Sequence, residues 1–241
     1  DGRHVRRGLL YRGCSLDTLQ SPADRTKLES LHLREILDLR SAGEAARQPD
    51  AAVSGAHYQR ICGMRYADGS EMDFSPAGIQ RIAAEKAAYE AKAGHPVHDF
   101  YWFTDLYKQM PFGNPAYHEL FRLLEEHRVP LLFHCTCGKD RTGILAALIL
   151  GVCGASTEDI AADYSVSQLY LRPMYRWMRE NIPDFAARAE NAPFFSTAGE
   201  NILAVCDHLE NEYGGAERFL RECGVGADTL DALRRRMIKK A

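Results

Sequence analysis

A continuous apolar run at 129–134 is followed by a short polar loop and then by a longer apolar stretch at 142–153. An apolar run of this length without alternation is typical of a strand that is buried on both faces, as in a parallel sheet. The longer stretch ends at Gly154 and predicts a helix, because glycine often terminates helices. A buried strand joined through a loop to an apolar helix is a unit of α/β folds.

The other patterns along the chain favour the same fold class. Further strands are predicted at 8–14, 34–40 and 56–62, and Ser21 followed by Pro22 predicts the start of a helix. Helices are predicted at 79–93, at 99–127 with a break at 111–115, and at 157–171, 173–180, 197–213, 215–223 and 227–238. The sequence therefore predicts one α/β domain over 1–241, with a central, mostly parallel sheet of about four to five strands flanked by helices.

The segment 64–98 differs in texture from the rest of the chain. Its helical stretch at 79–93 is rich in Ala and Glu and is bracketed by loops that contain Gly, Ser and Pro. A helix bracketed by loops between core elements predicts an inserted helical lid. The alternative is an ordinary surface helix, and the sequence does not decide between the two.

Composition narrows the class of protein. The 241 residues are 46% hydrophobic and 26% charged, and the net charge of −3 argues against nucleic-acid binding, which needs a basic field. No stretch approaches the ~20 apolar residues of a transmembrane segment. Seven scattered cysteines do not form a disulfide framework, so we expect a cytoplasmic protein. Because the sequence begins at Asp1 rather than Met, a secreted protein with a removed signal peptide is the alternative.

The loop after the buried strand holds Cys135 and Arg141 with five residues between them. A loop of this length can turn its backbone N–H groups inward and bind the oxygens of a phosphate or sulfate at the helix N-terminus. Gly138 relaxes the backbone there, and Arg141 can clamp two oxygens with its planar fork. The predicted phosphate-binding residues are Thr136, Cys137, Gly138, Lys139, Asp140 and Arg141.

The same loop predicts a reactive thiol at Cys135. A free cysteine has a pKa of about 8.5, and a helix N-terminus with nearby cations can lower it to about 3.5–7.5. A thiolate at Cys135 can attack phosphorus and form a phosphocysteine, which water then hydrolyses. Thr142 is expected to donate a hydrogen bond to the sulfur when it leaves, and His134 to orient the loop.

The leaving oxygen needs a proton, which predicts a carboxylic acid at the site. Asp140 is the nearest candidate in sequence. Other candidates, which could enter from neighbouring segments, are Asp68, Asp73, Asp99 and Asp105. Lys139 is expected to add positive charge at the rim, and Arg40 is expected to form a structural ion pair with Glu44.

The sequence from His134 to Gly143, HCTCGKDRTG, resembles the Cys-x5-Arg signature of the protein tyrosine phosphatase superfamily. Its ending resembles the bacterial and fungal branch, often called the lipid-phosphatase-like or triple-specificity group. Further resemblances to that branch are Leu10-Tyr11-Arg12, Asp38-Leu39-Arg40-Ser41 with Glu44, and Tyr213-Gly214-Gly215.

This resemblance implies a cysteine-phosphatase fold, a helical lid that fits 64–98, and hydrolysis of phosphotyrosine peptides without a metal or cofactor. It also implies that Asp140 is the general acid and that Lys139 contacts substrate phosphates. Some members of the group act on phosphoserine, phosphothreonine or phosphoinositides. A phosphoinositide phosphatase and a non-catalytic phosphate-binding module are therefore the alternatives.

A metal site is the competing interpretation of His134, Cys135 and Cys137. The sequence lacks a second ligand cluster at the required spacing, so no metal is predicted. Cys137 departs from the small residue expected at its position. It is either a buried filler or a redox partner that captures an oxidised Cys135 as a disulfide.

Overall fold

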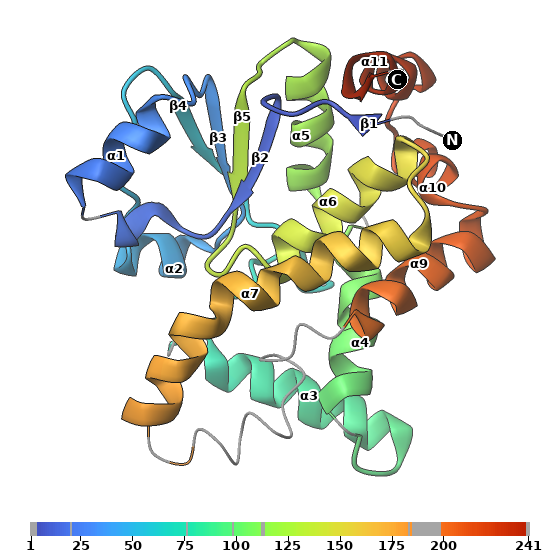
Figure 1. The fold of residues 1–241 in the computed structure, drawn as a ribbon. Helices are drawn as coiled ribbons and strands as arrows, with labels where there is room; N and C mark the ends of the chain where they lie inside the picture. Colours follow the sequence, from blue (N-terminus) through green and yellow to red (C-terminus); the bar gives the residue numbers. More distant parts are fainter. Residues whose placement is uncertain are drawn as a thin grey trace.

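The computed structural model describes residues 4–19, 21–75, 77–97, 99–111, 114–182, 184 and 199–239 (Figure 1). Four parallel strands form the central sheet in the order β2 (Leu10–Gly13), β5 (Leu131–His134), β3 (Glu35–Asp38) and β4 (His57–Arg60). Each lies within one of the predicted strand ranges. The predicted α/β class with a mostly parallel sheet is confirmed.

The strand register gathers the carboxyl ends of the strands at one edge of the sheet. His134, the last residue of β5, lies opposite Gly13 of β2 and Asp38 of β3. Asp38 in turn lies opposite Arg60 of β4. The loop that begins at Cys135 therefore leaves the middle of the sheet at the edge where α/β proteins commonly bind ligands.

Helices cover both faces of this sheet. In Figure 1, α1 and α2 lie on one side of the sheet, and α5 and α6 lie on the other with the C-terminal helices beyond them. The helices are α1 (Pro22–Glu29), α2 (Ala42–Arg47), α3 (Ile79–Ala93), α4 (Asp99–Gln109), α5 (Pro115–Glu125), α6 (Asp140–Val152), α7 (Thr157–Asn181), α9 (Glu200–Tyr213), α10 (Ala216–Glu222) and α11 (Ala227–Met237).

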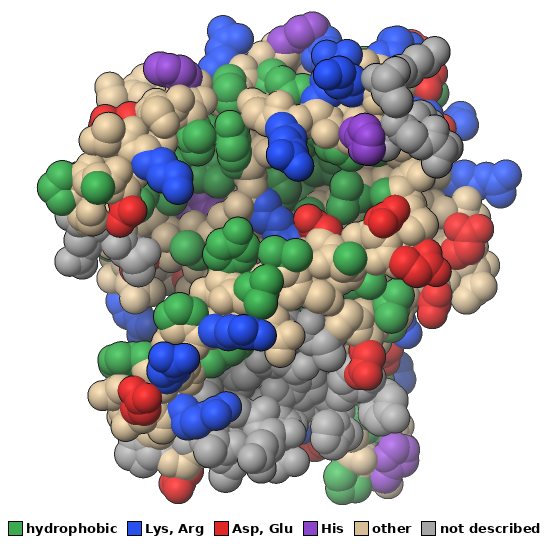
Figure 2. Space-filling view, in the orientation of Figure 1, with side chains coloured by type: hydrophobic (Ala, Val, Ile, Leu, Met, Phe, Trp, Pro, Cys, Tyr) green, Lys and Arg blue, Asp and Glu red, His purple; other side chains and the backbone are tan. Residues whose placement is uncertain are grey.

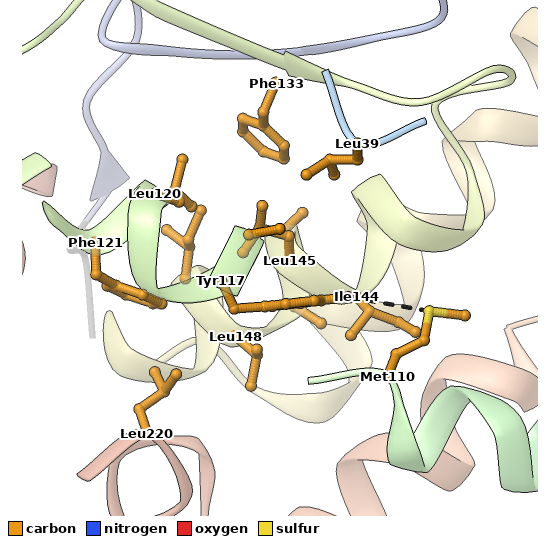
Figure 3. Packing of buried hydrophobic residues seen from close by; sticks show 14 of the residues in the cluster. Leu39, Met110, Tyr117, Leu120, Phe121, Phe133, Ile144, Leu145, Leu148 and Leu220 are labelled. Carbon is orange, nitrogen blue, oxygen red and sulfur yellow. Dashed lines mark hydrogen bonds between the residues drawn. The ribbon is translucent and has the colours of Figure 1, made fainter. Parts of the chain in front are cut away.

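The side chains of β5 alternate between two cores, because successive residues of a strand point to opposite faces. Leu131 and Phe133 join the large cluster that α5 and α6 complete, whereas Leu132 packs with Ile36 in a smaller cluster on the other face. Figure 3 shows the large cluster, in which Tyr117 of α5 lies among leucines of α6 and donates to the sulfur of Met110 at 3.9 Å. The central strand is thus buried on both faces, as its apolar sequence predicted.

Helices α6 and α7 and the strands β1 (His4–Val5) and β6 (Ile238–Lys239) differ from the sequence prediction. A single helix, α7, runs through Pro173, where two helices were predicted. Proline disfavours a helix interior because it lacks an N–H, but α7 also packs against α6 and α9. Helix α6 begins at Asp140, two residues before its predicted start. The strands β1 and β6 pair antiparallel, and with two residues each they are too short to show a hydrophobic pattern in the sequence. None of the helices in the described part of the chain has the length and apolarity to cross a membrane.

A buried ion network lies at the carboxyl edge of the sheet. Arg40 is only 1% exposed, and its Nη2 lies 2.8 Å from Oδ2 of Asp38 and 2.9 Å from Oδ2 of Asp50. Burial acts to raise the pKa of Asp38, but the hydrogen bonds from Arg40 outweigh it and hold that pKa below its usual value. The predicted ion pair between Arg40 and Glu44 is wrong, because the sequence spacing does not show which carboxylates the strand ends bring together.

Replacing Arg40 by methionine removes the charge and leaves two buried carboxylates unpaired. We expect Arg40→Met to lower the free energy of unfolding at neutral pH by about 3–5 kcal/mol. The difference should shrink in acid, because the lowered pKa of Asp38 contributes stability only above the pH at which its carboxylate protonates. Urea denaturation followed by circular dichroism measures both effects.

The matched control is Arg122→Met, which removes a half-exposed arginine paired with Glu119 and Glu126. An exposed pair contributes about 0–1 kcal/mol, so this variant should stay close to wild type. Equal losses in the two variants would show that burial of the Arg40 network is not what stabilises this edge of the sheet.

Candidate active site

The loop 135–139 links β5 to α6 and is shaped around Gly138. This glycine has a φ of +65°, and a Cβ placed there would lie 2.4 Å from the carbonyl oxygen of Gly13. Any other residue would therefore require both a strained backbone and a shift of β2. Cys135, at the start of the loop, is 2% exposed. Helix α6 begins directly after the loop, at Asp140.

Contacts from the end of β2 hold the loop from outside. The backbone N–H of Ser15 donates to the carbonyl of Thr136 at 3.1 Å, and Nε of Arg12 donates to the carbonyl of Gly138 at 3.3 Å. The same guanidinium pairs with Asp163 and donates to Ser167, both on α7. Arg12 therefore ties the loop, β2 and α7 together.

His134 is fully buried beneath the loop. Its Nδ1 lies 3.2 Å from the carbonyl oxygen of Cys135, and its Nε2 lies 3.1 Å from Oδ2 of Asp50. Within the described residues, Asp38, Asp50 and His134 bring three potential metal ligands within 4.8 Å of one another. Arg40 already pairs with both carboxylates, so the positive charge that a metal would bring is in place.

Arg141 makes a two-pronged ion pair with Glu44. Its Nη1 and Nη2 donate to the two carboxylate oxygens at 2.7 and 2.8 Å, and Thr136 donates to the same carboxylate at 2.7 Å. Glu44 is fixed in turn by the N-terminus of α2, where it and Ser41 accept from each other's backbone N–H. Burial acts to raise the pKa of Glu44, but the bonds from Arg141 lower it to about 2.

Asp140 stands where α4, α6 and α7 meet. Its Oδ1 accepts from the hydroxyls of Tyr107 and Tyr164, the latter at 3.3 Å, and lies 3.3 Å from Nζ of Lys139. Burial, followed by the charge of Asp140, raises the pKa of both tyrosines well above the usual value, so both hydroxyls are donors. Lys139 is 1% exposed, so the expected position at the rim is wrong: its ammonium faces this carboxylate inside the protein.

Helices α6 and α7 approach closely at Gly143. A Cβ at this position would lie 2.6 Å from the ring of Tyr164. A larger residue would therefore push α7 away and withdraw the tyrosine hydroxyl from Asp140. Gly143, the last residue of the sequence motif, therefore helps to keep the carboxylate of Asp140 in position.

A cavity of about 250 Å³ opens over the loop. Its polar floor includes Cys135, Arg141, Asp140 and Glu44. Its apolar and aromatic walls are formed by Phe74, Met174, Tyr175 and Met178. The remaining lining residues are Arg47, Gln48, Thr136, Cys137 and Lys139. The three wall residues of α7 were missed by the sequence analysis, which gave 173–180 no role at the site. The methionine and aromatic pattern of this stretch was the available signal.

The expected lid segment reaches this cavity at Phe74, whose ring centroid lies 5.6 Å from the guanidinium carbon of Arg141. Met72 and Ile82 of the same segment are buried in the large core. Helix α3 and α4 line a different cavity, of about 320 Å³. A lid function for 64–98 stays a prediction.

The alternative acids of the sequence analysis have other partners. Asp68 pairs with Arg81, Asp73 accepts from Ser41 and Ser75, and Asp105 accepts from Tyr89. None of these three carboxylates lines the cavity over the loop. The side chain of Asp99 lies outside the described residues. Asp140 is therefore the one of the described candidates that lines the same cavity as Cys135.

Two small side chains of the motif have informative surroundings. Burial raises the pKa of Cys137 to about 12, so this thiol is protonated at neutral pH. The hydroxyl of Thr142 is fully buried and has no hydrogen-bond partner in the described part of the chain. A buried hydroxyl without a partner is costly, which suggests that it is held for a group that arrives or changes during a reaction.

Replacing Glu44 by glutamine tests the ion pair with Arg141. The pKa of Glu44 falls from about 4.5 to about 2 on folding, so the pair stabilises the fold by on the order of 3 kcal/mol above pH 4.5. We expect Glu44→Gln to lose most of this at pH 7, and the gap from wild type to close as the pH falls from 4.5 towards 2. Glu217→Gln, which removes a half-exposed partner of Arg234, should cost about 0–1 kcal/mol in the same denaturation series. A gap that persists unchanged to pH 2 would contradict the assignment.

Comparison with known proteins agrees with this geometry. The sequence profile of the tyrosine phosphatase family matches residues 1–239. A tyrosine-protein phosphatase of Nostoc commune is 30% identical, over 89% of this chain and 69% of its own length. The triple specificity protein phosphatase PtpB of Mycobacterium tuberculosis is 29% identical, over 95% of this chain and 91% of its own length. The chain is a phosphatase and belongs to the tyrosine phosphatase family.

Proposed function

We propose that this phosphatase hydrolyses phosphotyrosine in proteins, with relaxed specificity, through a phosphocysteine on Cys135. The observation that carries the proposal is a buried cysteine that lines a cavity together with Arg141, at the start of a short loop that leads to the N-terminus of α6. A helix N-terminus and a guanidinium both favour a thiolate over a thiol. Glu44 accepts one short hydrogen bond from each terminal nitrogen of Arg141. The same nitrogens also donate to the carbonyl of Leu39 at 3.4 Å and to Oγ1 of Thr136 at 3.3 Å, and phosphate oxygens can replace these two longer bonds.

In the first step the Sγ thiolate of Cys135 attacks phosphorus, and the bond from phosphorus to the phenolic oxygen breaks. Asp140 donates a proton to that oxygen, so the substrate leaves as a neutral tyrosine. The three contacts of Asp140 described above are to Oδ1, so the proposed mechanism takes the transferred proton from Oδ2.

In the second step water attacks the phosphocysteine and the bond between sulfur and phosphorus breaks. Asp140, now ionised, accepts a proton from the water. The sulfur leaves as a thiolate, and the unpartnered hydroxyl of Thr142 donates to it. The loop amides and Arg141 hold the phosphoryl oxygens in both steps.

The cavity walls favour an aromatic substrate. Phe74, Met174, Tyr175 and Met178 form an apolar and aromatic surface suited to the ring of phosphotyrosine. PtpB of Mycobacterium tuberculosis, which is named a triple specificity phosphatase, supports relaxed specificity here. Phosphoinositide head groups are the second candidate substrate, favoured by Arg47, an exposed cation that lines the same cavity.

The proposed reaction needs no metal or cofactor, because the charges that it requires come from Arg141, the loop amides and Asp140. A thiolate nucleophile needs a reducing environment to stay active. All seven cysteines are free thiols in the structure, which supports a cytoplasmic location as a prediction.

The nucleophile is tested with Cys135→Ser. We expect phosphate release from p-nitrophenyl phosphate to fall by at least about a thousandfold, since the hydroxyl cannot replace the thiolate. Tungstate binding, measured by calorimetry, should remain because the loop amides and Arg141 are unchanged. Cys206→Ser, on α9, is the matched control and should retain activity. If wild type bound tungstate but released no phosphate, the chain would be a phosphate-binding module instead.

The acid is tested with Asp140→Asn across aryl phosphates of graded leaving-group pKa. Good leaving groups need little protonation, so their rates should fall by about tenfold or less. Poor ones should lose about 10²–10⁴-fold, the usual contribution of a general acid. Asp105→Asn is the control from the alternative acids and should leave the dependence on leaving group unchanged. Uniform slowing by Asp140→Asn would make Asp140 a positioning residue.

A further inference from the structure

Helix α7 exposes a stripe of large apolar side chains to solvent. Val166, Leu169, Tyr170 and Trp177 are 44, 55, 81 and 59% exposed. Val166, Tyr170, Pro173 and Trp177 follow one another at steps of four, three and four residues, which places them on one face of the helix. Single exposed apolar residues need no explanation, but a contiguous stripe of this kind marks an interaction surface.

Basic side chains border this stripe. Arg172, Arg176 and Arg179 are exposed and repeat at helical spacing along one edge of it. Asp and Glu are absent from residues 164–179, and the nearest carboxylates on α7 are those of Asp163, which pairs with Arg12, and of Glu180. Figure 2 shows hydrophobic and basic side chains together over the C-terminal half of α7, at the lower left of the view. The chain has a net charge of −3, so this cationic surface is local.

The opposite edge of the stripe borders the active site. Met174 and Met178, which lie on the flank of α7 away from the three arginines, line the cavity that holds Cys135. A partner that covers the stripe therefore lies beside the mouth of that cavity. We call the stripe and its arginines the α7 face: Val166, Leu169, Tyr170, Arg172, Pro173, Arg176, Trp177 and Arg179.

We infer that the α7 face docks on an anionic lipid surface. Aromatic rings with a polar edge, such as those of Tyr170 and Trp177, settle at the boundary between head groups and acyl chains. Guanidinium forks bind lipid phosphates, and each cation near such a surface strengthens binding. An apolar face edged by arginines is the pattern of a helix that lies in a membrane surface. Docking by itself needs no catalysis; the benefit of placing the cavity at the head-group layer rests on the proposed function.

Tryptophan fluorescence reports this docking directly. The chain has two tryptophans, and Trp102 is only 7% exposed, so a change on binding comes mainly from Trp177. We expect vesicles of phosphatidylcholine with phosphatidylserine to shift the emission of wild type to the blue and to sediment with it. Pure phosphatidylcholine vesicles should do neither, and added salt should weaken binding because it screens the arginines.

Two sets of variants locate the contact. Replacing Arg172, Arg176 and Arg179 together by glutamine should weaken partitioning onto anionic vesicles by about a hundredfold. Tyr170→Ser with Trp177→Ser should reduce sedimentation while leaving the arginines in place. The matched control replaces Arg6, Arg7 and Arg235 by glutamine. It removes the same charge from a cavity by β1 and α11, away from the C-terminal half of α7 (Figure 1), and should bind as wild type does.

The outcomes separate docking from catalysis. All α7-face variants should hydrolyse p-nitrophenyl phosphate at the wild-type rate, because none of the substituted residues lines the catalytic cavity. Wild-type binding by the triple-arginine variant, or an equal loss in the control, would overturn the inference. The inference would also be overturned if the variants raised only the KM for a phosphoprotein, because the α7 face would then bind protein. Vesicle binding by a wild type that hydrolyses no aryl phosphate would refute the proposed function and leave docking standing.

Discussion

The pair between Arg141 and Glu44 is the interaction on which the site depends. A buried guanidinium without a partner would cost several kcal/mol, and the pair removes that cost while fixing the plane of the fork. Glu44 also accepts from Thr136 and from the backbone at the start of α2. One carboxylate therefore joins the loop after β5 to the helix after β3, so the loop 135–139 is held in shape by a neighbouring strand connection as well as by its own sequence.

A second ionic layer lies beneath the first. Arg40 lies four residues before Glu44 in the sequence, yet the two side chains have different partners. Arg40 pairs with Asp38 and Asp50, whereas Glu44 pairs with Arg141. His134 stands between Asp50 and the carbonyl of Cys135. The loop that begins at Cys135 therefore contacts both charge-balanced groups: His134 links it to Asp50, and Thr136 donates to Glu44. Because both are buried, removing one member leaves a charge without compensation rather than a weakened contact.

Whether a feature could be predicted from the sequence depends on how far apart in the chain the interacting residues lie. Strand β5, the loop and α6 were predictable because apolar runs, glycines and the spacing of Cys135 and Arg141 are local properties. The partner of Arg141 was not, since the choice between Arg40 and Arg141 for Glu44 depends on how three strand ends align. The wall from α7 was missed for a similar reason. Pro173 predicted a break in the helix. The structure instead has one continuous helix, which packs against α6 and α9 and places Met174 and Met178 at the cavity over the loop.

Helix α7 also links the cavity to the proposed acid. Its residue Tyr164 donates to Asp140, Asp163 and Ser167 hold Arg12 against the loop, and Met174 and Met178 form a wall. The bond from Tyr164 fixes the position of Oδ1 of Asp140, so α7 helps to orient the proposed acid and also shapes the cavity. A force on the exposed side of α7 would therefore act on the wall and the acid together. Because Gly143 leaves no room between α6 and the ring of Tyr164, a small displacement of α7 would be transmitted to the carboxylate rather than absorbed.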